Sequence, residues 1–237
     1  MFTFFKKESK NYKIFLKKIF KKQLIMPNLL VYPIRGIIRK LSVSFLKFQE
    51  KPDVLVVSPG GCGSITLIKY LDKYKKSNIY FEKKYKFFHL GHIYKPNSYL
   101  KKNKIKIILI NRDHEDIFNS MLTRGFLRNS LNIFGDCFPF MYKNIFKDKK
   151  KLKNKYLKYL KFFYLNWKIY DENLILRLNF SDIYKDVNCQ KKIMNFLNIK
   201  TEKFLKEFPK YERYNKGVGF VDPSTNLTKE LYDDNNR

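Results

Sequence analysis

Short apolar runs alternate with amphipathic stretches along the chain after residue 50. Uninterrupted apolar runs are typical of strands buried in a parallel sheet, and apolar residues spaced three and four apart predict helices. We expect strands over residues 53–58, 85–90, 105–110 and 173–180. We expect helices over residues 64–74, 114–124, 151–170, 190–197 and 201–208. Strands separated by helices pair in parallel, so the pattern predicts a three-layer α/β fold with a central, mostly parallel sheet.

The first 50 residues have a different pattern. Over residues 11–23, apolar side chains recur at helical spacing and lysines occupy the other face. We favour a helix packed on the domain over a helix that lies on an anionic membrane surface. Lysines interrupt the apolar positions, so we expect neither a signal peptide nor a membrane span. The chain divides into a basic amphipathic helical extension, residues 1–50, and one domain, residues 51–237.

The formal net charge is +29, which favours acidic partners such as phosphate-bearing cofactors, anionic glycans, nucleic acid or an anionic membrane. The basic residues are dispersed and no nucleic-acid motif accompanies them, so nucleic acid is the least favoured partner. The three cysteines, Cys62, Cys137 and Cys189, show neither a disulfide framework nor metal-ligand spacing. A reducing cytoplasmic location, with peripheral membrane contact through residues 1–50 as an option, fits these features.

Three of the nine glycines, Gly60, Gly61 and Gly63, fall within four positions where a strand is expected to become a helix. A glycine-rich turn before a helix directs backbone N–H groups and the positive end of the helix dipole at an anion. The turn has no lysine at the position that a Walker A loop requires. We therefore expect a phosphate cradle of another kind, although a purely structural turn would leave the same pattern.

Two motifs resemble the sulfotransferase family. Cys62, Gly63, Ser64 and Ile65 stand where that family has the S-G-T-T-like turn of its 5'-phosphosulfate loop. After the next expected buried strand, Arg112 and Ser120 have the spacing of the family's 3'-phosphate element. An arginine at a strand's carboxyl end can grip a phosphate with two parallel bonds. The alternative for this arginine is an ion pair with a neighbouring aspartate.

Two later segments resemble the same family in part. Ser181 and Asp182 stand where it has an E-D-L turn, a feature that supports fold more than chemistry. Lys216 and Gly217 match part of its R-K-G loop, which closes over the 3'-phosphate. The resemblance covers roughly residues 53–220, and it implies a P-loop NTPase-like sulfotransferase fold.

The resemblance implies sulfuryl transfer from 3'-phosphoadenosine 5'-phosphosulfate (PAPS) to a hydroxyl, without a metal. In that family the base is often a histidine shortly before a proline, which favours His92 over His89, with Lys95 as an accessory cation. The abundant aromatic residues suggest a glycan acceptor. We expect Gly61 to contribute only backbone to the cofactor site.

One departure from the family opens an alternative. Gly61 occupies the position where the family usually has a lysine or arginine that stabilises the leaving oxygen. Either another cation such as Lys95 takes over, or the protein binds a nucleotide or an anionic glycan without turnover.

Overall fold

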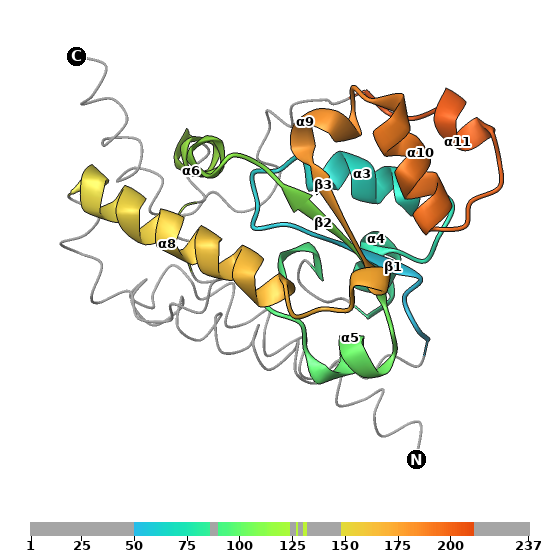
Figure 1. Ribbon diagram of the computed structural model, residues 1–237, viewed down its shortest axis with the longest axis horizontal. Helices are drawn as coiled ribbons and strands as arrows, with labels where there is room; N and C mark the ends of the chain where they lie inside the picture. Colours follow the sequence, from blue (N-terminus) through green and yellow to red (C-terminus); the bar gives the residue numbers. More distant parts are fainter. Residues whose placement is uncertain (1–49, 86–89, 124–126, 128–129, 132–147, 211–237) are drawn as a thin grey trace, which may run out of the picture.

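A parallel three-stranded sheet forms the centre of the protein (Figure 1). The computed structural model describes residues 50–85, 90–123, 127, 130–131 and 148–210. The strands are β1 (Val54–Val57), β2 (Lys106–Asn111) and β3 (Ile175–Asn179), in the order β1-β2-β3. The register pairs Val54 with Lys106 and Ile107 with Ile175. β2 lies between two neighbours, which explains why its centre is an unbroken buried apolar run.

Helices cover both faces of this sheet (Figure 1). On one side lie α3 (Ser64–Leu71), α10 (Val187–Phe196) and α11 (Lys203–Lys206), and on the other lie α5 (Ser98–Lys102) and α8 (Lys149–Trp167). The Tyr70 hydroxyl of α3 donates to the Phe204 carbonyl of α11. The Trp167 indole at the end of α8 donates to the Ile93 carbonyl across 3.2 Å. The three-layer α/β architecture with a parallel sheet is confirmed.

The predicted strand over residues 85–90 is wrong at both of its described ends. Tyr85 ends α4 (Asn78–Tyr85), and Leu90 begins the short 3-10 helix η2 (Leu90–His92). The outer edge of β1 is covered by other groups. The Asn78 amide accepts from the Val56 N–H at 2.8 Å and donates to its carbonyl at 3.0 Å. The Ser58 N–H donates to the Gly91 carbonyl at 2.9 Å.

The remaining element boundaries shift by a few residues for identifiable reasons. α8 begins at Lys149 because the Asp148 carboxylate caps it, accepting from the Lys151 N–H at 3.0 Å. The last strand starts later than predicted, because a turn capped by Asp171, η4 (Glu172–Leu174), precedes it. Two helices complete the description: α6 (His114–Thr123) and α9 (Phe180–Ile183).

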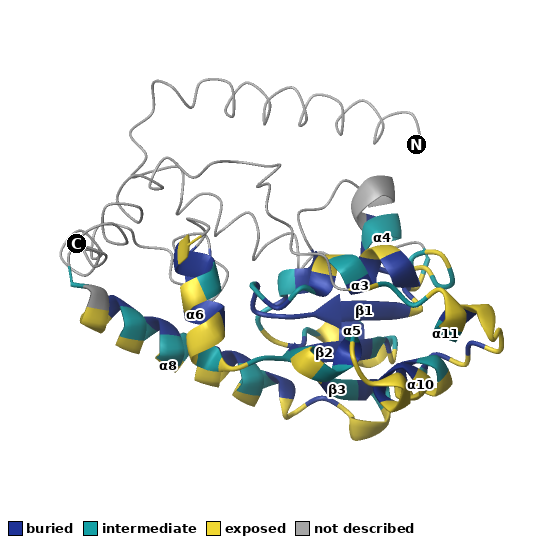
Figure 2. Ribbon diagram, turned by 90° about the horizontal axis from the view of Figure 1, so that it is seen from above, coloured by how far each residue is buried: buried dark blue, intermediate teal, exposed yellow. Residues whose placement is uncertain are grey.

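Figure 2 shows β1 buried along its whole length, whereas β3 is partly exposed, as are the outer faces of the helices. Trp167, Tyr156 and Phe163 of α8 are fully buried, as the predicted apolar face requires. No helix within the described ranges is both long and apolar enough to cross a membrane. The predicted extension, residues 1–50, lies outside the described residues apart from Glu50, so the domain division stays a prediction.

Candidate functional site

Two strand-to-helix corners lie at the carboxyl edge of the sheet. β1 leads through residues 58–63 into α3, and β2 leads through Arg112 and Asp113 into α6. Because β1 and β2 are parallel neighbours, both corners emerge on the same edge. Ligands of open α/β sheets bind at this edge.

The glycine turn adopts a conformation that other residues rarely reach. Gly60 has φ +97°, and a Cβ atom added there would lie 3.2 Å from the Met121 Cε atom of α6. The same position lies 3.7 Å from the His92 Cε1 atom. The turn therefore packs against α6 and η2, and a side chain at residue 60 would have to displace the end of the Met121 side chain.

The N-terminus of α3 is open to an anion. Its N-cap, Gly63, has φ 61°, and no side chain caps the helix. The first turn carries no acidic residue, while Lys69 lies in the last turn. The first N–H groups of a helix have no partner within it, and they carry the positive end of the helix dipole. Backbone donors are thus the groups that this end offers to a ligand.

Side chains of the turn stabilise the turn itself. The Ser58 hydroxyl donates to the Ser64 hydroxyl at 3.2 Å and accepts from the Gly60 N–H at 3.4 Å. The Cys62 thiol is buried and donates to the Gly60 carbonyl at 3.2 Å. Two of the predicted cofactor residues, Cys62 and Ser64, therefore serve the loop with their side chains. Ile65, the next predicted residue, is exposed on the first turn of α3.

Arg112 joins the two corners. Its NH1 group donates to the Gly61 carbonyl at 2.7 Å, and its NH2 group lies 3.5 Å from an Asp116 carboxylate oxygen. The guanidinium carbon lies 4.8 Å from the centre of the Phe180 ring. Its Nε atom is buried without a hydrogen-bond partner among the described residues. The side chain as a whole stays 22% exposed.

The second corner is closed by carboxylates. Asp113 accepts from the Asp116 N–H at 3.0 Å and thereby caps α6. Backbone N–H donors, first that of Asp116, lower the pKa of the Asp113 carboxyl below its ordinary value. Glu115 and Asp116 add two further acidic side chains to the first turn. Two cations accompany these carboxylates: Lys153 pairs with Glu115 at 2.9 Å, and Arg112 reaches toward the glycine turn.

The preferred base, His92, lies beside the glycine turn. Its Nδ1 atom is 2.8 Å from the Ser58 carbonyl oxygen. A carbonyl only accepts, so Nδ1 carries the proton, and in the neutral ring Nε2 has the lone pair that a general base needs. Lys95 is exposed just beyond η2. His89 lies outside the described residues.

The structure describes one of the three remaining predicted site residues, Ser120. Ser120 is half-buried on α6, two helical turns after Arg112. Lys216 and Gly217 lie outside the described residues. His114, which was not assigned a role, stacks on Tyr164 with ring centres 5.4 Å apart.

Aromatic and hydroxyl side chains from distant segments support the turn. Tyr164 donates to the Ile110 carbonyl at the end of β2 at 3.2 Å, and burial raises the pKa of its phenol, so the donor stays protonated. Ser130 donates to the Pro59 carbonyl at 3.3 Å. Tyr184 donates to the Gly63 carbonyl at 2.8 Å. Sequence reasoning missed all three roles, because no local pattern marks a contact made across the fold.

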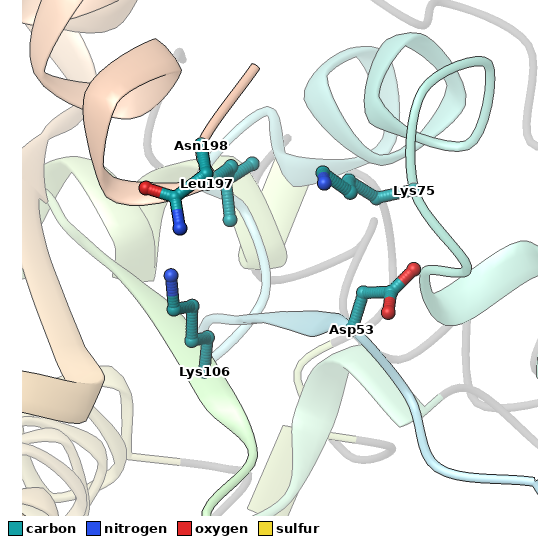
Figure 3. A pocket seen from close by; sticks show the side chains of 5 residues that line it. All are labelled: Asp53, Lys75, Lys106, Leu197 and Asn198. Atoms are coloured by element: carbon teal, nitrogen blue, oxygen red, sulfur yellow. The ribbon is translucent and has the colours of Figure 1, made fainter.

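A shallow pocket of about 170 Å³ lies at the opposite, amino edge of the sheet (Figure 3). Its lining consists of Asp53, Lys75, Lys106, Leu197 and Asn198. Lys106 donates to the Phe196 carbonyl at 2.5 Å, and the Asp53 carboxylate accepts from the Lys76 N–H at 2.8 Å. These charges hold the ends of elements together, so the pocket does not compete with the carboxyl edge. Among the described residues, no group of three or more side chains could hold a metal ion.

No protein-family model matches the sequence, and no curated protein matches it. Among solved structures, the chain is similar to mouse sulfotransferase SULT7A1 complexed with PAP, with a TM-score of 0.46 and 19% identity. The similarity covers 72% of this chain and 68% of that one. A likeness this distant leaves the function to be inferred from the site itself.

Proposed function

We propose that the protein is a sulfotransferase that binds PAPS at the carboxyl edge of the sheet and transfers its sulfuryl group to a hydroxyl acceptor, with saccharides as the acceptor class. The contact between Arg112 and the Gly61 carbonyl, at 2.7 Å, carries this proposal. It brings a guanidinium and an uncapped helix N-terminus to one place. Two anion-binding groups side by side suit a ligand with two anionic ends.

The residues present fit such a nucleotide in two respects. The first turn of α3 has neither a capping side chain nor a carboxylate, so it can receive the 5'-phosphosulfate. The Nε atom of Arg112 lacks a protein partner within the described residues, and the side chain is 22% exposed, as expected of a cation with which a 3'-phosphate would pair. When bound, the donor supplies an activated sulfuryl group.

The chain's own residues then have limited tasks. Backbone N–H groups of α3 hold and orient the anionic oxygens near the turn, and such fixed donors stabilise developing charge. The Nε2 atom of His92 takes the proton of the acceptor hydroxyl, because its Nδ1 proton is already committed to the Ser58 carbonyl. That carbonyl also fixes the ring's orientation beside the turn.

Gly61 supports a second candidate function, a nucleotide-binding or anionic-glycan-binding protein without turnover. The turn carries no cationic side chain of its own, and the guanidinium of Arg112 is bonded to the turn's backbone. A site of this kind binds an anion while stabilising a leaving oxygen poorly.

Isothermal titration with 3'-phosphoadenosine 5'-phosphate (PAP) tests the binding step. We expect the wild type to bind and Arg112→Ala to bind at least about thirtyfold more weakly, because a bidentate charged contact is lost. Arg177→Ala is the matched control, since Arg177 lies on β3 and its guanidinium pairs with Glu172 of η4. A wild type that does not bind PAP, confirmed folded by circular dichroism, contradicts the proposal.

Labelled-sulfate transfer from PAPS to a panel of saccharide and phenolic acceptors separates the two candidates. Transfer that disappears in His92→Ala while PAP binding persists supports the enzyme. Binding with no product from any acceptor favours the non-catalytic alternative.

A further inference from the structure

The segment that follows β3 contacts both halves of the candidate site. α9 starts at Phe180, directly after the strand, and Tyr184 is its C-cap. From these two positions, one ring lies against Arg112 and one hydroxyl reaches the glycine turn. In the sequence this segment suggested only a structural turn.

Phe180 sets the plane of the Arg112 guanidinium. The guanidinium carbon lies 4.8 Å from the ring centre, within the range of an attractive cation–π contact. The polar contacts hold the group firmly at one point only, because the bond to Gly61 is short at 2.7 Å and the pair with the exposed Asp116 is long at 3.5 Å. The aromatic face and the Gly61 carbonyl together define both the tilt and the rotation of the guanidinium.

Tyr184 sets the direction of a backbone donor in the turn. Its hydroxyl donates to the Gly63 carbonyl at 2.8 Å. A peptide unit is planar and trans, so its C=O and the next N–H point in opposite directions. Fixing the Gly63 carbonyl therefore fixes the Ser64 N–H, which belongs to the uncapped first turn of α3. Glycine otherwise permits this peptide more freedom than other residues would.

The two rings belong to one rigid piece of structure. Their centres are 5.9 Å apart at an interplanar angle of 67°. Between them the Asp182 carboxylate accepts from the Ser181 hydroxyl at 2.6 Å and from the Asn179 amide at 3.2 Å. These bonds hold α9 on the end of β3, so both rings stand on a fixed backbone.

We propose that Phe180 and Tyr184 form an aromatic clamp that positions the two anion-binding corners separately. Phe180 holds Arg112 ready for a 3'-phosphate, and Tyr184 holds the Ser64 N–H ready for a 5'-phosphate. Both are positioning residues. This inference rests on the proposed function, and it adds that each phosphate has its own aromatic support.

Three nucleotides separate the two supports: PAP, adenosine 3'-monophosphate and adenosine 5'-monophosphate. In calorimetric titrations, Phe180→Leu should weaken PAP and the 3'-monophosphate by about fivefold and leave the 5'-monophosphate unchanged. Tyr184→Phe should weaken PAP and the 5'-monophosphate by about threefold and leave the 3'-monophosphate unchanged. Phe180→Tyr should restore wild-type binding, because it keeps the aromatic face. Tyr74→Phe removes a hydroxyl near the other end of α3 and should change nothing.

A ligand-free measurement accompanies the titrations. The Phe180 ring current should shift the Arg112 Nε–H resonance upfield in a nitrogen–proton correlation spectrum, and Phe180→Leu, but not Phe180→Tyr, should remove that shift. Equal losses for all three nucleotides, or no loss for any, would overturn the clamp. If the folded wild type binds none of the nucleotides, the proposed function fails, whereas the resonance still decides whether Phe180 positions Arg112.

Discussion

The helices α3 and α6 follow adjacent parallel strands and begin at the same edge of the sheet, yet their N-termini differ in charge. α3 begins at a glycine, with no capping side chain and no acidic residue in its first turn. α6 begins after the Asp113 cap and has Glu115 and Asp116 in its first turn. Both helices have the positive end of their dipole at this edge, so the difference comes from the side chains. Carboxylates occupy the end of α6, and none occupies the end of α3.

The acidic N-terminus of α6 lies next to the uncapped N-terminus of α3. Its own carboxylates satisfy its dipole, so of the two ends only that of α3 is without an acidic side chain in its first turn. Arg112 comes from the closed corner and reaches over to the open corner through the Gly61 carbonyl. The contrast between the two ends can be tested by exchanging their features.

Converting the open end into a closed one should have the largest effect. Gly63→Asp places a carboxylate at the N-cap of α3, and we expect PAP affinity to fall by about thirtyfold or more, because like charges about 4 Å apart near a surface repel by roughly 4 kcal/mol. Gly63→Asn is the matched control, since asparagine tolerates the left-handed conformation and caps helices without charge. Equal losses in the two variants would mean that backbone strain, not charge, closes the site.

Removing the cap of α6 should have a moderate effect on stability. Asp113→Ala leaves the Asp116 N–H without its acceptor, and we expect the midpoint of thermal unfolding to fall by about 3 °C. Asp113→Asn keeps an acceptor oxygen and should stay close to the wild type. If calorimetry finds the alanine variant as stable as the asparagine variant, Asp113 does not cap the helix.

Lowering the pH should reveal how much the Asp113 cap contributes to stability, because its carboxylate becomes protonated. The Asp113 carboxyl has a lower pKa in the folded protein than its ordinary 3.8, chiefly because the Asp116 N–H donates to it. It therefore contributes stability that is complete above the unfolded-state value and is lost as the pH falls through the folded one. Urea titrations from pH 5 to pH 2.5 should show a shallower loss in Asp113→Asn. Asp148 and Asp182 also have lowered pKa values, so part of the acid sensitivity should remain.

The smallest effect is expected from Asp116→Asn. The pair between Asp116 and Arg112 is long and exposed, and such pairs contribute little. Neutralising Asp116 removes a competitor for the guanidinium and should tighten PAP binding by about twofold at low salt. The gain should shrink at higher ionic strength, as screening requires. Unchanged affinity at every salt concentration would show that Asp116 does not compete with the ligand.

Sequence patterns predicted the parts of the fold that depend on local order. The buried runs became β1, β2 and β3, and the glycine turn and Arg112 were placed at the carboxyl ends of strands because strand direction follows from the helical crossovers. The pairing of β1 with β2, seen in the structure, brings the two positions to one edge. The structure adds a 2.7 Å bond between Arg112 and the Gly61 carbonyl, so the two corners are in direct contact.

The missed features depend on contacts between distant segments. Tyr184 lies 121 positions after Gly63, and Ser130 lies 71 positions after Pro59. Neither residue type nor spacing reveals such pairs. The predicted strand over residues 85–90 was wrong for a related reason. Asn78 and Gly91 bond to the chain along the outer edge of β1, and the spacing of apolar residues does not reveal such bonds.

The Asn78 amide also covers part of a strand edge at which another molecule could pair. The described residues contain no strand on the outer side of β1, and an unpaired strand edge invites pairing with another molecule. One side chain imitates a peptide group there, offering Val56 both a donor and an acceptor. A single amide thus does for that rung of the ladder what a fourth strand would do, and its loss would both leave buried backbone groups of Val56 without their partner and open this edge to another molecule.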